Sequence, residues 1–511
     1  MRQNPYGFLQ QFAMIPVLVL TAGLVLNVLV DPLRRFDVVT IEGFNAQKAQ
    51  FANDMRLGKA GALCRIQPAS IAMGTSRVEL GIDPKHPGWN HALGPVYNLA
   101  MPGMGMRELV LTFMHAVHSS SRLQLAVIGL DFDMFNANRE AVIFGREVAG
   151  FDERRLLLSN FDFCWRAFLY DFKSYLGLRG LYSSLATIAK QMPERERDVP
   201  ARAMEWLALS GADGFRDGDA VFRARVRTGG YRALFGTAQE SAYVASTWRP
   251  APERRYCFTR EGQPNTFDHF RELVRFARKS GIDLRLFIAP IHGRLLLALQ
   301  EAGLWPQYED WKRGLVDSLE EEARESGGVA FPIWDFSGFN SVTMEPVPPA
   351  GDIETEVLWF WEPSHFKKEA GDLMLDRVLG HHEPTRDIPD DFGTLLSKSN
   401  IETMLLRSRE AGRSYVEREA EDAQLVRNVV AKALENSTGS NCGFDREALR
   451  EGVRALNRGD ESAAETAFAR AVEIHDADRR RFMELGVPYQ ERGFEDALAA
   501  ARNGTFAGFG R

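Results

Sequence analysis

Short apolar segments that end in turn residues alternate, along the middle of this chain, with segments of helical periodicity. The apolar segments read SIAMGTS, LQLAVIGLDF, DLRLFIAP and VAFPIWDFS, and they cover residues 70–76, 123–132, 283–290 and 329–337. Helical spacing of apolar residues marks residues 106–119, 267–280 and 311–324. Strands that alternate with helices pair in parallel, so the sequence predicts an α/β fold with a doubly wound parallel sheet.

Polar residues follow three of these predicted strands. Ser76, Asp131 and His292 each stand just past a strand end. In doubly wound sheets the ligand site lies beyond the carboxyl ends of the strands. We therefore expect the chemistry of this protein at that edge of the sheet.

The N-terminus carries a run without any charged residue, from Phe12 to Val30. A membrane-spanning helix needs about 20 mainly apolar residues. A cleaved signal peptide is the alternative, but it needs a shorter apolar core and small residues at its cleavage site, and this run ends in NVLVDP. The sequence predicts a tail over 1–11, an uncleaved transmembrane anchor over 12–30 and a polar stalk over 31–61. The flanking charges give no clean orientation.

Composition excludes several classes of protein. The net charge of −7, the pI near 5.9 and the lack of a long basic run argue against a nucleic-acid partner. The cysteines form no CxxC pair, which argues against zinc fingers and disulfide scaffolds, although one or two disulfides stay open in an oxidising compartment. His115 and His118 have no carboxylate at ligand spacing, so we expect no metal, and no cofactor motif is present.

The remaining segments divide the chain by composition. We assign residues 62–137 and 266–385 to the α/β domain. Residues 138–265 are rich in aromatic residues and arginine and predict a helical insertion that covers one side of the sheet. Residues 386–511 are rich in Glu, Arg and Ala and predict a helical C-terminal region with one weak tetratricopeptide-like hairpin.

Three residues in two distant segments suggest nucleophilic chemistry. A serine becomes a nucleophile when a base lies within hydrogen-bond reach and a third group orients that base. Glu362 and His365 stand three residues apart, just before a predicted helix. We expect His365 to accept the proton of Ser76 while Glu362 fixes the imidazole tautomer. Each pattern alone also fits an ordinary turn or helix cap; the prediction depends on their joint occurrence.

Five blocks of the sequence occur in the order typical of one superfamily. They read GTSRVELGIDP, YNLAMPGMGMRE, AVIGLDFDMF, APIHGR and WEPSHFKKEAG. In these blocks the chain resembles the SGNH (GDSL-type) hydrolases, and among them the membrane-anchored proteins of alginate O-acetylation and of D-alanyl transfer to teichoic acid. The resemblance implies a flavodoxin-like three-layer fold. It also implies a single-pass protein of the bacterial inner membrane with its globular part in the periplasm.

The resemblance also implies roles for individual residues. Ser76 matches the nucleophile, His365 the base, and Glu362 stands where the family has aspartate. The oxyanion donors match Ser76 and Gly103 or Gly105. Asp131 replaces the asparagine donor of the third block, and an ionised carboxylate would repel an oxyanion; the substitutes open to the chain are Asn136, Asn98 and Arg77. The candidate substrate-binding residues are Arg77, Asn98 and His292.

Three functions remain open at this point. The first is an extracytoplasmic serine O-acyl esterase or O-acyltransferase that acts on an acylated envelope or exported polysaccharide or on an acyl donor. The second is a non-catalytic protein of the same fold that binds polysaccharide or partners a membrane-bound O-acyltransferase, as Asp131 suggests. The third is an assembly protein that works through its C-terminal helices.

Overall fold

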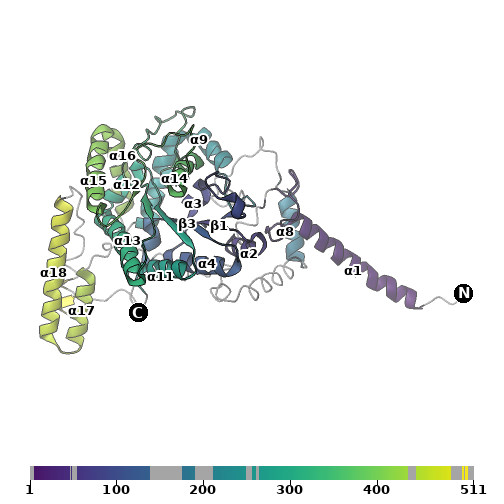
Figure 1. Cartoon of the computed structure of the whole chain (residues 1–511), viewed down its shortest axis with the longest axis horizontal. Helices are drawn as coiled ribbons and strands as arrows, with labels where there is room; N and C mark the ends of the chain where they lie inside the picture. The colour runs from purple at the N-terminus through teal and green to yellow at the C-terminus, as the bar shows by residue number, and fades with distance from the viewer. Residues whose placement is uncertain are drawn as a thin grey trace.

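A six-stranded sheet forms the centre of the molecule (Figure 1). The computed structural model describes residues 5–46, 48, 55–138, 175, 177–189, 191, 211–248, 256–259, 264–435, 445–484, 498–499 and 501–503. The strands lie in the order β2 (Val96–Asn98), β1 (Ser70–Met73), β3 (Leu125–Leu130), β4 (Asp283–Ile288), β5 (Ile333–Asp335) and β8 (Thr394–Leu395). The first five are parallel, and their order is that of flavodoxin-like doubly wound sheets, in which the ligand site lies between β1 and β3.

Helices cover both faces of the sheet because its strands are buried on both sides. Ile71 and Met73 of β1 point into one hydrophobic cluster, whereas Ala72 between them points into the other. The first cluster includes residues of α2 (Met55–Ile66), α4 (Met106–Ser119), α11 (Thr266–Lys279), α12 (Gly293–Glu301) and α13 (Trp305–Ser326). The second includes residues of α3 (Ser76–Gly81), α9 (Asp219–Ala233) and α14 (Lys368–Leu379). The chain is therefore a layered α/β protein.

The predicted strands β1, β3, β4 and β5 and the predicted helices α4, α11 and α13 are all present. The all-parallel prediction needs one correction, since β8 pairs antiparallel with β5 through Trp334 and Leu395. This edge strand also shows that the region from residue 386 is not purely helical. Two residues are too few to show the period-two alternation of a strand in the sequence, which is why β8 was not predicted.

The expected stalk over 31–61 ends earlier than predicted. Residues from Met55 onward form α2, which packs on α4 within the first cluster. Lys59 of α2 is fully buried. A buried lysine in a polar-looking segment gives no sequence signal of burial, because lysine is rarely buried without partners.

Part of the C-terminal region belongs to the main domain. Helices α15 (Ile401–Arg418) and α16 (Ala420–Leu434) contribute Leu405, Tyr415 and Val426 to the first cluster. Helices α17 (Asp445–Asn457) and α18 (Glu461–Glu484) form the predicted hairpin and share a separate apolar cluster with Leu498 and Ala501. The hairpin lies beside the domain and not across the sheet (Figure 1).

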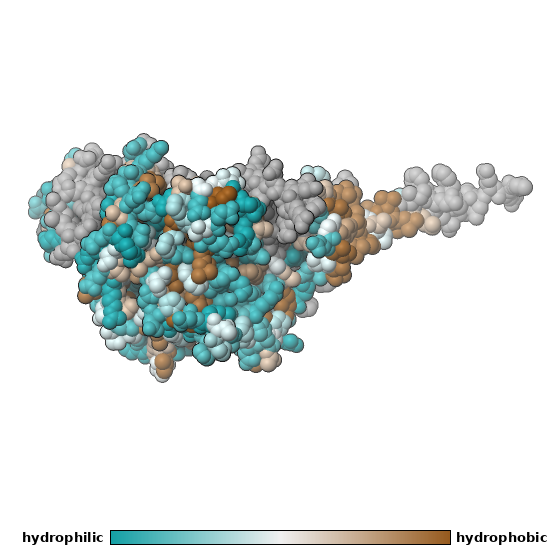
Figure 2. Space-filling view, turned by 90° about the horizontal axis from the view of Figure 1, so that it is seen from above, coloured by the Kyte–Doolittle hydropathy of each residue, from teal (hydrophilic) through white to brown (hydrophobic). Residues whose placement is uncertain are grey.

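Helix α1 (Pro5–Val30) extends away from the domain (Figure 1), and Figure 2 shows hydrophobic residues along it. Its exposed apolar side chains include Val17, Val19 and Val25. Over the residues that the structure describes, none of the helices is both long and apolar enough to cross a membrane. The side chains at the start of the predicted anchor lie outside the described residues. The membrane anchor over 12–30 therefore stays a prediction.

The predicted insertion lies mostly outside the described residues. The parts that the structure does describe are mainly helical: α8 (Leu178–Ala189), α9, the π-helical η6 (Leu234–Glu240), α10 (Ser241–Tyr243) and η7 (Val244–Trp248). Helix α8 lies beside α1, whereas α9 and η6 join the second hydrophobic cluster.

Candidate active site

A tight turn after β1 delivers Ser76 to the edge of the sheet. Thr75 caps α3, because its side-chain oxygen accepts the backbone N–H of Arg77 at 3.3 Å. Gly74 has a φ of +149°, and a Cβ there would come within 2.8 Å of the carbonyl oxygen of Gly129. Only glycine fits between β1 and β3 at this point, and the turn leaves Ser76 partly exposed as the first residue of α3.

A hairpin presents the base and its carboxylate together. Glu362 ends β6 (Phe360–Glu362) and His365 begins β7 (His365–Phe366), and the two residues face each other across the antiparallel pair. His365 Nε2 lies 2.7 Å from Ser76 Oγ. On its other side, Nδ1 is hydrogen-bonded to Glu362 Oε1. The structure thus brings together the three residues that the sequence selected from two distant segments.

Burial fixes the carboxylate of this triad. The side chain of Glu362 is fully buried, while that of His365 keeps 15% of its surface exposed. The second carboxylate oxygen, Oε2, accepts the backbone N–H of Ser364 at 3.0 Å. A carboxylate held by two bonds can keep the imidazole in the tautomer whose Nε2 accepts the serine proton.

A second carboxylate anchors the strand that carries Glu362. Glu345 accepts the backbone N–H groups of Leu358 and Trp359 at 2.8 Å and of Phe360 at 3.0 Å. Burial raises the pKa of Glu345 to about 7, although these three donors act in the opposite direction. Glu345 therefore fixes the start of β6.

His292 supports the hairpin and does not face Ser76. Its backbone N–H donates to the carbonyl oxygen of Pro363 at 2.9 Å, and its Nδ1 caps α12 by accepting the N–H of Arg294. Nε2 lies 2.9 Å from the carbonyl oxygen of Glu345, and burial lowers the pKa of His292 to about 3. Both ring nitrogens are bonded within the protein and the residue is 1% exposed, so the structure gives no support to the predicted substrate contact of His292.

Asn98 is likewise a structural residue. Its amide donates to the carbonyl oxygens of Val78 at 2.9 Å and Ile82 at 2.8 Å, and its oxygen accepts the N–H of Ala100. These bonds hold the C-terminal end of α3. Because Asn98 is fully buried, the structure supports neither a substrate contact nor an oxyanion contact for it.

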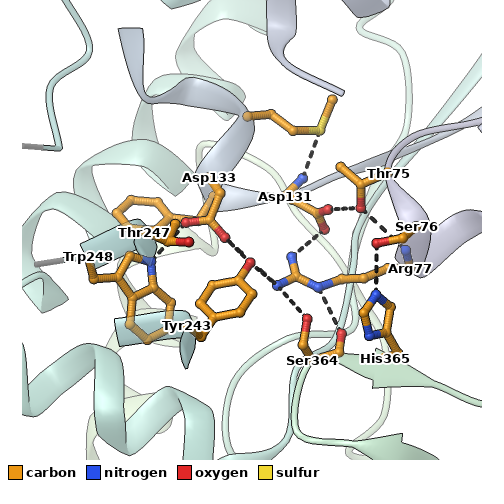
Figure 3. A network of polar contacts seen from close by, with 12 residues as sticks. Thr75, Ser76, Arg77, Asp131, Asp133, Tyr243, Thr247, Trp248, Ser364 and His365 are labelled. Carbon is orange, nitrogen blue, oxygen red and sulfur yellow. Dashed lines mark hydrogen bonds and ion pairs between the residues drawn. The ribbon is translucent and has the colours of Figure 1, made fainter. Parts of the chain in front are cut away.

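Arg77 and Asp131 form an ion pair next to Ser76 (Figure 3). Arg77 Nη1 lies 2.8 Å from Asp131 Oδ1, and Asp131 Oδ2 accepts the hydroxyl of Thr75. Arg77 Nε also donates to the carbonyl oxygen of Ser364 at 2.9 Å. Both charged residues are buried, Arg77 at 4% and Asp131 at 3% exposure, and they pair with each other, so the structure gives no support to the predicted substrate contact of Arg77.

The insertion adds residues that the sequence did not single out. Arg77 Nη2 donates to Tyr243 OH at 2.9 Å, and that hydroxyl in turn donates to Asp133 (Figure 3). Trp248 Nε1 donates to the other oxygen of Asp133 at 2.8 Å. No sequence pattern connects Tyr243 and Trp248 of the insertion to residues that lie between 110 and 166 positions earlier.

The two glycines expected at the oxyanion site follow β2. Gly103 has a left-handed φ of +69°, and Gly105 caps α4. The loop is tied to the nucleophile turn, because the N–H of Met101 donates to the carbonyl oxygen of Gly74 at 3.0 Å. The backbone N–H groups of Ser76 and Gly103 have no acceptor among the described residues. Asn136 is buried and uses its oxygen for the N–H groups of Asn138 and Cys257.

A buried group of ion pairs, here called the ionic node, holds α3 through Glu79. Lys59 Nζ lies 3.0 Å from Glu79 Oε1 and also donates to the carbonyl oxygens of Ala100 and Gly214. Arg216 forms an ion pair with the other oxygen of Glu79. Burial, and then the charge of Arg216, lowers the pKa of Lys59 well below its usual value. The node joins α2, the loop after β2 and the segment around 211–216 to the helix that carries Ser76.

Two cysteines, Cys64 and Cys257, are disulfide-bonded, and the part of the chain that the structure describes holds no free cysteine. Across the same described residues, no group of three or more His, Cys, Asp or Glu side chains is arranged to hold a metal ion. No family model and no curated protein matches this chain.

Proposed function

We propose that this protein is a serine O-acyl esterase or O-acyltransferase of the SGNH type that acts on an acylated polysaccharide outside the cytoplasmic membrane. The observation that carries the proposal is the hydrogen-bonded line from Ser76 Oγ through His365 to Glu362, with Oγ and Nε2 2.7 Å apart. Three further features support the resemblance to SGNH hydrolases. They are the turn after β1, the glycine loop after β2 and the position of His365 just before α14.

The chemistry follows from this line of groups. Ser76 Oγ attacks the carbonyl carbon of an O-acyl ester while His365 Nε2 takes the hydroxyl proton, and Glu362 stabilises the imidazolium. The N–H groups of Ser76 and Gly103, which lack internal acceptors among the described residues, are suited to hold the oxyanion. His365 then returns the proton to the leaving sugar oxygen. Water or a second hydroxyl, deprotonated by His365, attacks the acyl-serine and frees Ser76.

The state of the cysteines supports an extracytoplasmic site. Disulfides form and persist in oxidising compartments and are rare in the cytosol. The disulfide-bonded Cys64 and Cys257 therefore favour the periplasm or another extracytoplasmic space. In this proposal α1 attaches the domain to the inner membrane, where a membrane-bound O-acyltransferase is the expected partner. The exposed apolar side chains of α1, and Tyr182 and Leu185 of α8 beside it, support this attachment.

The non-catalytic alternative now has less to support it. It was motivated by Asp131, whose carboxylate would repel an oxyanion. That carboxylate faces Arg77 and Thr75 instead, so its charge is matched within the protein.

The test compares ester hydrolysis by the wild type and by Ser76→Ala, with 4-nitrophenyl acetate and an O-acetylated polysaccharide as substrates. The proposal predicts a loss of about 10³-fold or more for Ser76→Ala. Ser399→Ala, at an exposed serine far from the site in the sequence, is the matched control and should keep full activity. Equal activity of Ser76→Ala and the wild type would refute the proposal.

A further inference from the structure

A ring of polar contacts connects the nucleophile turn to the base hairpin without using the triad. Thr75, which precedes Ser76, donates its hydroxyl to Asp131 Oδ2. Asp131 Oδ1 lies 2.8 Å from Arg77 Nη1. Arg77 Nε then reaches the carbonyl oxygen of Ser364, the residue before His365, at 2.9 Å. The ring therefore joins the chain neighbours of the two reacting groups (Figure 3).

The charges in this ring are isolated from solvent. Arg77 and Asp131 are 4% and 3% exposed, so neither side chain is free to meet a polymer that arrives from outside. Burial lowers the pKa of Arg77, but the carboxylates of Asp131 and Asp133 and the hydroxyl of Tyr243 outweigh burial and raise it. Burying an ion pair is costly, and removing one partner leaves the other uncompensated. The guanidinium of Arg77 is held by several contacts, so it is suited to fix the position of the nucleophile turn relative to the base hairpin.

We propose that Arg77 and Asp131 are positioning residues, which hold Ser76 and His365 at reacting distance, and that Asp131 is the counterion of Arg77 and not an oxyanion group. This inference rests on the proposed function, since it concerns the same serine. Tyr243 extends the device to the insertion, because its hydroxyl accepts from Arg77 and donates to Asp133.

The substitution Asp131→Asn separates this proposal from the family-based expectation. If residue 131 faced the oxyanion, asparagine would restore a donor and speed the reaction. If Asp131 is the counterion of Arg77, asparagine leaves the buried guanidinium with only the more distant carboxylate of Asp133, 3.8 Å from Nη2, and frees it to shift. A displacement near 1 Å at the reacting groups costs about 10²-fold in rate. Asp131→Asn should therefore speed the reaction if residue 131 faces the oxyanion and slow it if residue 131 is the counterion of Arg77.

The experiment measures the rate and the endpoint of covalent labelling of the full chain by a fluorophosphonate. We expect Asp131→Asn and Arg77→Met each to slow labelling by about 10²-fold, with an unchanged endpoint of one label per chain. A merely destabilised protein would instead show a lower endpoint at the normal rate. The double variant should be no slower than Arg77→Met alone, because the two residues act as one unit. Asp317→Asn, which removes a surface ion pair to Lys398, is the matched control.

A milder variant covers the case in which the buried substitutions do not fold. Tyr243→Phe removes the hydroxyl that bonds Arg77 and Asp133. It should slow labelling by about 3- to 10-fold, in line with the loss of its one hydrogen bond to Arg77. If the wild type is labelled, faster or unchanged labelling of Asp131→Asn would overturn the proposal. If Asp131→Asn does not fold, unchanged labelling of Tyr243→Phe would overturn it.

A readout independent of activity separates this inference from the proposed function. The imidazole ¹⁵N signals of His365, assigned by their absence in His365→Gln, report the bonds of Nε2 and Nδ1. They should change in Asp131→Asn and stay unchanged in Asp317→Asn. If the wild type does not label but these signals change, the proposed function fails and the positioning role stands. Unchanged signals in Asp131→Asn would refute the positioning role whatever the labelling result.

Discussion

At the scale of single residues, the account depends on a fully buried carboxylate that serves a partly exposed imidazole. Glu362 accepts from His365 and from the N–H of Ser364, so its charge is held in place on both oxygens. Replacing it by an isosteric amide keeps the shape and allows the wrong histidine tautomer.

We predict that Glu362→Gln lowers kcat for acetyl-ester hydrolysis by about 10³- to 10⁴-fold with little change in KM. Steady-state kinetics on the purified variant checks this, and Glu356→Gln, at an exposed glutamate that pairs with Arg223, is the control. A Glu362→Gln variant within tenfold of the wild type would show that the carboxylate does not orient His365.

His292 gives a prediction about pH. Its pKa is lowered from 6.5 to about 3 by burial, so the unfolded chain binds the proton more strongly and stability falls as the pH falls below 6.5. Between pH 7.5 and pH 5 this loss amounts to about 2 kcal/mol. His292→Asn keeps a capping oxygen for α12 and cannot titrate. Denaturant unfolding should show a shallower pH dependence for His292→Asn, and parallel curves for both proteins would contradict this role.

The residue scale also shows what the sequence could predict. Ser76, Glu362 and His365 were accessible because each follows or precedes a recognisable element and the chemistry needs these residue types. A sequence does not reveal whether a polar side chain turns towards the ligand edge or into the protein, which is why the internal hydrogen bonds of Asn98 and His292 were not predicted. Arg77, the ion-pair partner of Asp131, follows the turn residue Thr75 by only two positions. Nothing in the sequence pattern indicated that Arg77 pairs with Asp131.

At the scale of elements, the site depends on the crossing of α3 and α14. A Cβ on Gly371 would come within 1.7 Å of the carbonyl oxygen of Gly81, so the two helices meet through glycine. Phe366 of β7 packs against the same point, since a Cβ on Gly81 would meet its ring at 2.0 Å. The packing that positions α3 therefore also positions the strand that begins with His365.

We predict that Gly371→Ala costs about 1–3 kcal/mol of stability, because α14 must move away from α3, and that it also slows ester hydrolysis. Gly61→Ala is the matched control, since nothing lies within 4 Å of its added Cβ. It should leave stability unchanged or raise it by about 0.5–1 kcal/mol through helix propensity. Thermal unfolding of both variants tests the pair, and a Gly371→Ala variant as stable as the wild type would contradict the close crossing.

The accuracy of the sequence prediction at this scale followed element length. The longer strands β3 and β4, and helices such as α4 and α11, carry enough residues to show their period. Strands β2, β6, β7 and β8 have two or three residues and were not predicted. Strand β5 also has three residues, but it was predicted because it lies within the longer segment over 329–337. The sequence predicted a loop before a helix where the structure has the hairpin of β6 and β7. The predicted loop nevertheless placed Glu362 and His365 together.

At the scale of the whole molecule, the two C-terminal helix pairs behave differently. Val426 and Val430 of α16 lie in the main hydrophobic cluster, and Asp422 of α16 pairs with the buried Arg294 at 2.8 Å. The cluster shared by α17 and α18 contains no residue of the α/β domain.

We predict that a chain truncated after Glu435 keeps its melting temperature and its ester hydrolysis. A chain truncated after Glu419 loses α16, exposes the cluster around Val426 and should aggregate or melt at a markedly lower temperature. Circular dichroism and hydrolysis assays on the two truncated chains decide this. Loss of activity in the longer one would mean that α17 and α18 contribute to the site.

The central claim is that Ser76 is a nucleophile activated by His365, and peptide mapping after fluorophosphonate treatment tests it most directly. We expect one phosphonyl adduct per chain, located by mass spectrometry on Ser76, formed slowly or not at all in His365→Gln and absent in Ser76→Ala. An unmodified wild-type chain, or an adduct on another residue, would contradict it.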